Sequence, residues 1–183
     1  TLLKENDISE SSVSKKYEEN IKSVIAKFGE NITLGKISNL STDIGFIQNY
    51  IHGVGNIGTI ACFETEKAET QSKEDFVAMT MGITMHIAAM NPEYLIREDV
   101  PQNVVTENRE IFKKQAKESG KPDNVLEKIV DGQMNKFYGD IVLLEQIYVK
   151  DQKKKIQDVI SEVAKKCSDK ITLKAYKRLE LGA

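Results

Sequence analysis

The sequence predicts an α+β fold: an antiparallel β-sheet packed against helices, with a projecting antiparallel two-helix arm of the coiled-coil type. Three observations carry this prediction. Residues 46–64 form two strand-like segments around a Gly-rich turn, residues 171–181 alternate like a returning strand, and two long helical stretches with narrow apolar stripes lie between them. Two neighbouring strands, then helices, then a distant strand are typical of a three-stranded sheet with helices on one face.

The hairpin turn contains a literal Gly-x-Gly-x-x-Gly from Gly53 to Gly58, which is the pattern of a dinucleotide-binding loop. In such a loop the glycines must open a helix, because the pyrophosphate lies on the helix N-terminus. Here Gly58 is followed by Thr59–Glu64, a segment rich in residues that favour a strand. We therefore interpret the glycines as hairpin-turn residues that adopt positive φ angles.

The N-terminal part predicts a helix that begins near Asp7 and ends at Gly29, followed by an alternating strand over residues 31–40. We expect residues 1–41 to be the remnant of an amino-terminal core subdomain and residues 42–183 to form the carboxy-terminal core subdomain. The first residues lack an initiator Met and the pattern of a signal peptide, so we expect the chain to be a fragment of a longer protein.

The arm is predicted at about residues 101–137. One helix starts near Pro101 and ends at Ser119, a Gly-Lys-Pro break follows, and a second helix begins at Asp123. Each helix has a thin apolar stripe among many charges. Such a narrow stripe suits a two-helix arm in solvent better than a helix docked on a sheet.

Two further helices are expected to cover the sheet. Residues 73–90 have a broad apolar face, which predicts a largely buried helix. After a short extended piece at 146–149, Asp151 is expected to cap a last helix over residues 152–166. The basic run Lys153–Lys155 is interpreted as a solvated helix face and not as a nucleic-acid patch.

The composition excludes several classes of function. The 183 residues are 40% hydrophobic and 30% charged, as in ordinary globular domains. A net charge of −2 gives no reason to expect direct nucleic-acid or membrane binding, and no apolar run approaches the ~18 residues that a membrane span needs. Cys62 and Cys167 lie far apart and outside any metal-binding spacing, so we expect no metal site and a reduced, cytoplasmic environment.

Residues that could carry catalysis are few. The chain has two histidines: His52 precedes the hairpin turn, and His86 lies inside the apolar helix. We interpret His86 as a packed core residue with one satisfied hydrogen bond. There is no nucleophilic Ser elbow, no phosphate-binding loop and no cluster with metal-ligand spacing. The residues alone therefore predict an α+β interaction domain with no enzymatic activity and no cofactor.

Short motifs run through nearly the whole chain in a fixed order. They are Ala26–Ile32, Ile51–Gly53 with Ile57-Gly58, Met85–Ala89 with Pro92, Gly120–Pro122, Glu127–Gly132, Asn135–Phe137, Leu143–Gln146 and Tyr176–Glu180. In this order and combination, the chain resembles bacterial-type elongation factor Ts.

The resemblance implies a guanine-nucleotide exchange factor for the GTPase elongation factor Tu in translation elongation. The implied mechanism is negative coupling: the factor binds best to a partner whose nucleotide and Mg²⁺ site is distorted, and so promotes GDP release. Linkage then requires that nucleotide also expels the factor. No proton transfer is needed, which agrees with the lack of catalytic motifs.

The resemblance also implies partner-binding residues. Phe28 and Gly29 match a helix-end contact to the GTP-binding domain of elongation factor Tu. His52, followed by Gly53, matches a His that points towards the partner's phosphate-binding loop. Residues 176–181 match a part that serves a distal contact or dimerisation, so a homodimer through the carboxy-terminal sheet or the arm is a second expected assembly.

The chain also departs from the family pattern. The Thr-Asp-Phe-Val motif, which inserts a Phe near the partner's Mg²⁺ site, is missing, as is a small three-helix module. Residues 74–77 look like that motif, but helix packing of Phe76 explains them. We therefore take the chain as the carboxy-terminal two-thirds of such a factor and expect weaker exchange than from a full-length one.

Two other interpretations remain open. The first is a dimerisation or scaffold module without exchange activity. The second is an enzyme that uses His52 as a general base, although no second group that could orient this base is evident. The effect of His52→Ala on nucleotide exchange separates the exchange factor from the scaffold.

Overall fold

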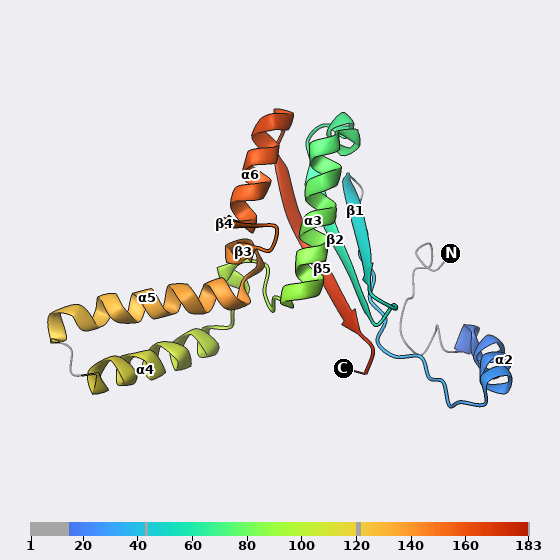
Figure 1. Cartoon of the computed structure of the whole chain (residues 1–183), viewed down its shortest axis with the longest axis horizontal. Coiled ribbons are helices and arrows are strands. Elements are labelled where there is room, and N and C mark those ends of the chain that lie inside the picture. The colour runs from blue at the N-terminus through green and yellow to red at the C-terminus, as the bar shows by residue number, and fades with distance from the viewer. Residues whose placement is uncertain (1–14, 43, 120–121, 183) are drawn as a thin grey trace.

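The structure, a computed structural model, describes residues 15–42, 44–119 and 122–182. Its elements, with η for a 3-10 helix, are α2 (Glu18–Phe28), β1 (Gly45–His52), β2 (Ile57–Thr65), η2 (Ala68–Ser72), α3 (Glu74–Met90), η3 (Arg97–Asp99), α4 (Gln102–Glu118), α5 (Asp123–Ile141), η4 (Leu143–Glu145), β3 (Ile147–Tyr148), β4 (Asp151–Lys155), α6 (Ile156–Cys167) and β5 (Ile171–Glu180) (Figure 1). The predicted α+β class is confirmed.

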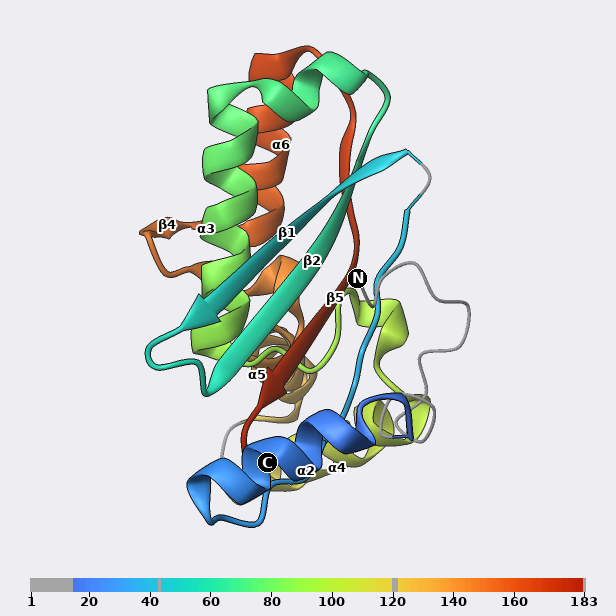
Figure 2. The same ribbon diagram turned by 90° about the vertical axis from the view of Figure 1, so that its right-hand side faces the viewer.

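The main sheet has three antiparallel strands, as predicted, and their order is β1-β2-β5. Phe46 pairs with Phe63 in the hairpin, and Thr65 pairs with Ile171 in the returning strand. Helices α3 and α6 lie side by side on one face of this sheet (Figure 2). The other face keeps Ile47 and Ile51 exposed.

The core lies between the sheet and these two helices. Phe76 of α3 is fully buried, and its ring meets Phe46 at 5.4 Å and Phe63 at 6.3 Å between centroids, both in edge-to-face geometry. The packing role predicted for Phe76 is therefore confirmed. Cys62 and Cys167 are buried free thiols, and Cys62 packs in the core as a small apolar residue.

Gly82 of α3 is needed for a close approach of the β3–β4 hairpin. A Cβ at this position would lie 1.9 Å from Oη and 3.2 Å from Cζ of Tyr148, whose ring is buried. By contrast, a Cβ at Gly132 of α5 would have no heavy atom within 4 Å.

These two glycines make a matched pair for a stability test. We expect Gly82→Ala to destabilise the fold by about 1–3 kcal/mol, because the overpacking outweighs the better helix propensity of Ala. We expect Gly132→Ala to stabilise it by up to about 1 kcal/mol, since only the propensity changes. Urea unfolding of both variants measures the difference, and a stabilised Gly82→Ala would contradict the expectation.

The arm is formed by α4 and α5, which pair with each other and project away from the sheet (Figure 1). Phe112 and Phe137 stack edge-to-face across it at 6.4 Å, and Arg109 bonds to both Glu127 (2.8 Å) and Asp131 (2.9 Å). The apolar seam also contains the buried residues Ala116, Leu126, Val130 and Met134. The predicted arm is confirmed, although α5 runs four residues further than expected, to Ile141.

The predicted strand at 31–40 is wrong. Residues 31–42 are without regular secondary structure, and β1 has only β2 as a neighbour in the main sheet. Alternation alone misled the prediction, because a strand also needs a partner edge. The predicted helix before this segment is present as α2, and it ends at Gly29 as expected. Its predicted start near Asp7 lies outside the described residues.

The last helix begins later than predicted. Residues 151–155 form β4, which pairs with β3, and α6 starts at Ile156. Asp151 caps no helix: its carboxylate accepts from the Lys153 N–H at 3.1 Å. Asp158 takes over the N-terminal role, since its carboxylate accepts from the Lys155 N–H at 3.0 Å.

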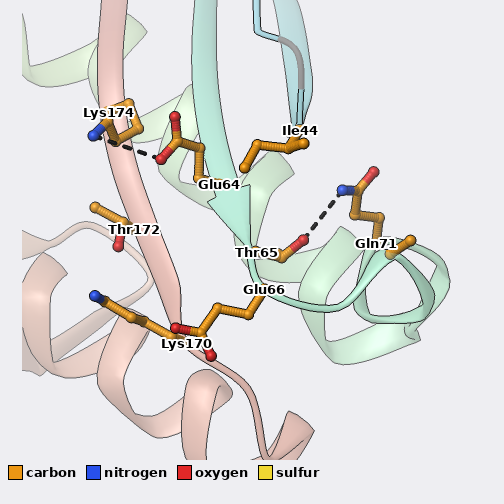
Figure 3. Close-up of a pocket in the computed structure, with 10 residues that line it drawn as sticks. Ile44, Glu64, Thr65, Glu66, Gln71, Lys170, Thr172 and Lys174 are labelled. Carbon is orange, nitrogen blue, oxygen red and sulfur yellow. Dashed lines mark hydrogen bonds and ion pairs between the residues drawn. The ribbon is translucent and has the colours of Figure 1, made fainter.

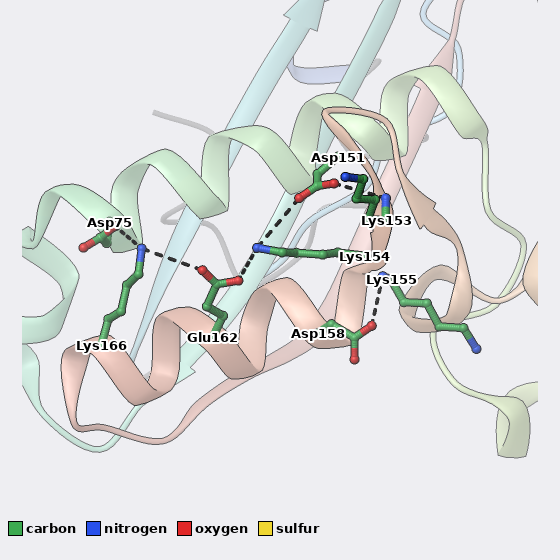
Figure 4. A network of polar contacts seen from close by, with 8 residues as sticks. All are labelled: Asp75, Asp151, Lys153, Lys154, Lys155, Asp158, Glu162 and Lys166. Atoms are coloured by element: carbon green, nitrogen blue, oxygen red, sulfur yellow. Dashed lines mark hydrogen bonds and ion pairs between the residues drawn. The ribbon is translucent and has the colours of Figure 1, made fainter.

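The basic run at 153–155 is only partly a solvated face. Lys153 is exposed, but Lys154 is half-buried between Asp151 and Glu162. Glu162 also faces Lys166, whose ammonium lies 3.2 Å from Asp75 of α3, so the ion pairs run from β4 across α6 to α3 (Figure 4). Most of the lysine charges in this network are thus paired with nearby carboxylates.

Candidate partner-binding surface

His52 is the last residue of β1 and is exposed beside the hairpin turn. Its Nδ1 lies 2.9 Å from the hydroxyl of Tyr50. The two side chains meet because residues i and i+2 of a strand point to the same face. A Tyr50 hydroxyl that donates to Nδ1 leaves the ring proton on Nε2, which then presents a donor to an incoming group. The sequence analysis did not identify Tyr50 as a partner of His52, although the i, i+2 spacing of the two residues on a strand places them on one face.

The turn after His52 has the conformation that its glycines were predicted to supply. Gly53 and Gly55 have φ angles of 58° and 97°, in the region that favours glycine. The Gly55 N–H donates to the carbonyl of His52 at 3.1 Å and closes the turn. The chain continues directly into β2 and not into a helix, so the interpretation as a hairpin instead of a dinucleotide-binding loop is confirmed. The positive φ predicted for the third glycine is wrong, because Gly58 lies within β2.

Phe28 and Gly29 form the C-terminal end of α2. Gly29 has the left-handed φ of 70°, and its N–H donates to the carbonyl of Ile25 at 2.8 Å. This geometry ends the helix and leaves Phe28 with 63% of its surface exposed. Helix α2 has no buried residue of its own. An aromatic side chain held at a fixed helix end, with little covering it, is suited to a pocket on another protein.

These two predicted contacts lie towards the same end of the sheet (Figures 1 and 2). Exposed apolar side chains accompany them there: Ile51 of β1, Val54 of the turn and Leu181 after β5. The N–H of Leu181 donates to the carbonyl of Asn56 at 2.8 Å, which ties the end of β5 to the turn. Segment 33–36 and Asn56 share a hollow of about 570 Å³. The arrangement is an open apolar surface around a rigid turn.

Tyr176, the first residue of the predicted distal segment, is not free for such a contact. Its hydroxyl donates to the carbonyl of Pro92 at 2.7 Å, and burial raises its pKa to about 12. Arg178 likewise donates to the carbonyl of Ala88 at 3.2 Å. Of this segment, Leu181 is the residue most open to a partner.

A second hollow, of about 950 Å³, lies at the opposite end of β2 and β5 (Figure 3). Glu64 and Lys174 are paired across it at 3.5 Å, and Gln71 donates to the hydroxyl of Thr65 at 3.1 Å. Seven of the ten residues that line this hollow are polar or charged. Ligand pockets are mostly apolar with a few convergent polar groups, so this hollow does not have their character. None of the predicted site residues lines it.

His86 is a core residue, as predicted. It is fully buried in α3, and Nε2 lies 2.9 Å from Oε1 of Gln146. The N–H of Val149 donates to Nδ1 at 3.3 Å, so the neutral ring donates from Nε2 to Gln146. Burial lowers the pKa of His86. Both ring nitrogens are used, and the ring has no route to the exposed surface around His52.

The described part of the chain comprises residues 15–42, 44–119 and 122–182. Within it, no group of three or more His, Cys, Asp or Glu side chains is placed to hold a metal ion. No helix among the described residues is long and apolar enough to cross a membrane.

An α+β domain with a projecting helical hairpin and an exposed apolar turn has the build of a protein-interaction domain. The family model for elongation factor Ts matches residues 2–183, and the chain therefore belongs to the elongation factor Ts family.

Individual relatives agree with this assignment. Elongation factor Ts of Trichlorobacter lovleyi is 44% identical over 158 residues, which cover 86% of this chain and 51% of the relative. That of Aquifex aeolicus is 39% identical over 162 residues, covering 88% and 53%. For the protein of Syntrophobacter fumaroxidans the values are 41% over 139 residues, covering 76% and 70%. The chain thus spans about half the length of the first two relatives.

Proposed function

We propose that the chain promotes GDP release from the GTPase elongation factor Tu and that it does so in the cytoplasm, as an exchange factor and not as an enzyme. Family membership is the observation that carries the proposal. The surface around His52 supports it, because the side chain is exposed, held by Tyr50 and mounted on a two-stranded turn that closes with a hydrogen bond. A rigid donor of this kind can press on a phosphate-binding loop without taking part in any bond-making step.

The proposed contact has two parts. Phe28 offers apolar area at the end of α2, and His52 offers a polar group at the end of β1. Apolar anchors supply most of the affinity in protein interfaces, whereas a polar group aimed at the nucleotide site discriminates between partner states. Exchange then follows from linkage: contacts made only with the nucleotide-free partner lower its affinity for GDP by the same factor by which GDP weakens binding of this chain.

The test is GDP release from elongation factor Tu loaded with a fluorescent GDP, at rising concentrations of this chain. We expect His52→Ala to slow catalysed release by about tenfold or more, the effect of losing an interface hot spot. Tyr50→Phe is the matched control, since it keeps the His52 ring and removes only the hydroxyl that orients it. We expect that variant to lose much less.

The same experiment distinguishes the alternative, an interaction or dimerisation module without exchange activity. If elongation factor Tu releases GDP as fast with His52→Ala as with the parent chain, the turn has only a structural role. If neither chain accelerates release, but both bind the nucleotide-free partner, the module interpretation replaces the exchange factor. A homodimer through the sheet or the arm stays a prediction, and the exposed Ile47 and Ile51 on the open sheet face are compatible with it.

A further inference from the structure

Gln146 lies where the arm meets the rest of the molecule, and each of its polar groups contacts a different helix. Its Oε1 accepts from Nε2 of His86 in α3 at 2.9 Å, and its Nε2 donates to the carbonyl of Asp140 in α5 at 2.7 Å. Its main-chain carbonyl accepts from the N–H of Ile156, the first residue of α6, at 3.0 Å. The residue is 1% exposed, so no water competes for these bonds.

The chain neighbour of Gln146 makes a second tie at the same point. Glu145 accepts from Nε and Nη2 of Arg97, which lies just before α4. Arg97 also donates to Oδ1 of Asn135 at 3.1 Å, and its guanidinium stacks 4.4 Å from the ring centroid of Tyr138. Both Asn135 and Tyr138 belong to α5, so Arg97 links Glu145 to the arm.

The main chain closes the junction. The N–H groups of Glu93 and Tyr94 both donate to the carbonyl of Ile141, at 3.0 and 3.1 Å, and Leu143 donates back to Tyr94 at 2.8 Å. The two segments that connect the arm to the core are therefore bonded to each other directly below the arm. These bonds join the two connecting segments to each other and not to α3, so the direction of the arm relative to α3 depends on side-chain contacts.

We propose that Gln146 is a positioning residue that fixes the direction of the helical arm relative to the sheet, with Arg97 as its supporting contact. The buried side chain of Gln146 joins the arm helix α5 to α3, and its main-chain carbonyl adds the contact to α6. Without it, the buried ring of His86 and the carbonyl of Asp140 lose their partners, and α5 is free to tilt about the paired main-chain segments. The arm and the sheet then move independently of each other, whereas in the parent chain they move together.

The experiment measures the distance between the arm and the sheet by pulsed electron paramagnetic resonance. Spin labels are placed on the exposed positions Lys128→Cys in α5 and Lys177→Cys in β5. Cys62 and Cys167 are buried, and labelling of the chain without new cysteines shows whether they react. Samples diluted with unlabelled chain remove distances between two copies.

The decisive comparison is between two glutamines. Gln146→Met removes the arm contact. Gln48→Met removes another buried glutamine, 9% exposed against 1% for Gln146, which accepts from the hydroxyl of Thr80 in α3 at 3.3 Å and does not reach the arm. We expect Gln146→Met to give about a doubling of the width of the distance distribution or a shift of its centre, and Gln48→Met to leave it unchanged. Labels on Lys114→Cys and Lys128→Cys, both within the arm, should report the parent distance in every variant.

An unchanged distribution in folded Gln146→Met would overturn the proposal. Should that variant fail to fold, Arg97→Gln provides the same test from the exposed side of the junction, where loss of the side chain leaves the sheet core intact. If the distance distribution of Arg97→Gln is as narrow as that of the parent chain, the arm direction is set by other contacts. The same conclusion follows if Gln48→Met widens the distribution as much as Gln146→Met does.

Discussion

Phe76→Ala is expected to remove about 3–5 kcal/mol from the free energy of unfolding, a large part of the ~5–15 kcal/mol that holds a typical domain together. The physical reason is the position of this ring on the sheet face that α3 covers, where it packs against one residue of each hairpin strand. It is fully buried and touches Phe46 and Phe63 edge-to-face, so truncation leaves a cavity that neither strand can fill without leaving the sheet. Urea unfolding followed by circular dichroism measures the loss.

Phe112→Ala serves as the matched control, because this ring lies in the arm and is half-buried. We expect it to weaken the arm and to leave the sheet core at its parent stability. A loss below about 1 kcal/mol for Phe76→Ala would show that the α3–hairpin contact is not the main source of stability.

The second large effect is a loss of stability in mild acid, caused by His86. Burial lowers its pKa in the folded chain, while the unfolded chain binds the proton near the ordinary value of about 6.5. The unfolded state therefore binds more protons below that value, so stability is fully present above about pH 6.5 and falls as the pH decreases. The loss ends once the pH has passed the folded-state pKa.

The expected slope is about 1.4 kcal/mol per pH unit for this one group. Its surroundings explain the sign: the neutral ring accepts from the N–H of Val149, and a proton on Nδ1 would face that donor. The other groups around it, Gln146 and the phenol of Tyr148, carry no negative charge that could stabilise an imidazolium.

The check is the unfolding free energy between pH 7.5 and 5.5, a range in which ordinary carboxylates stay ionised. His86→Gln removes the titrating ring and should flatten the slope. An equal slope in the parent chain and in this variant would place the effect on other groups.

The elements that the sequence predicts best are those in which the pattern and the packing agree. The hairpin, α3, the arm and the returning strand each have enough apolar positions at one period to fix the face that is buried. The prediction of a strand at 31–40 is wrong because alternation is a property of one segment, whereas a strand forms only by pairing with a neighbouring strand. The start of α6 fails because Asp151 and Asp158 are both suitable caps, and the choice depends on β3 pairing with β4.

The candidate site could likewise be predicted from the sequence only in part. The glycine-dependent turn and the exposed end of α2 follow from local chemistry, since positive φ angles are required at Gly29 and Gly53. The roles of Phe28 and His52 come from the resemblance, because an exposed aromatic ring or imidazole does not identify its partner. The hydrogen bond from Tyr50 and the junction at Gln146 are three-dimensional contacts, and the second joins segments that no periodicity connects.

The large sequence separation between β2 and its neighbour β5 bears on how the protein folds. The sheet is complete only when Ile171 reaches Thr65, and the whole arm lies between these two residues in sequence. Closing so long a loop has a large entropy cost. The pairing of α4 with α5 closes only a short loop and costs less, so the arm can form first and on its own. During synthesis the edge of β2 then stays unpaired until β5 emerges. The paired helices of the arm hold its two ends together, which lowers the entropy cost of bringing β5 to β2.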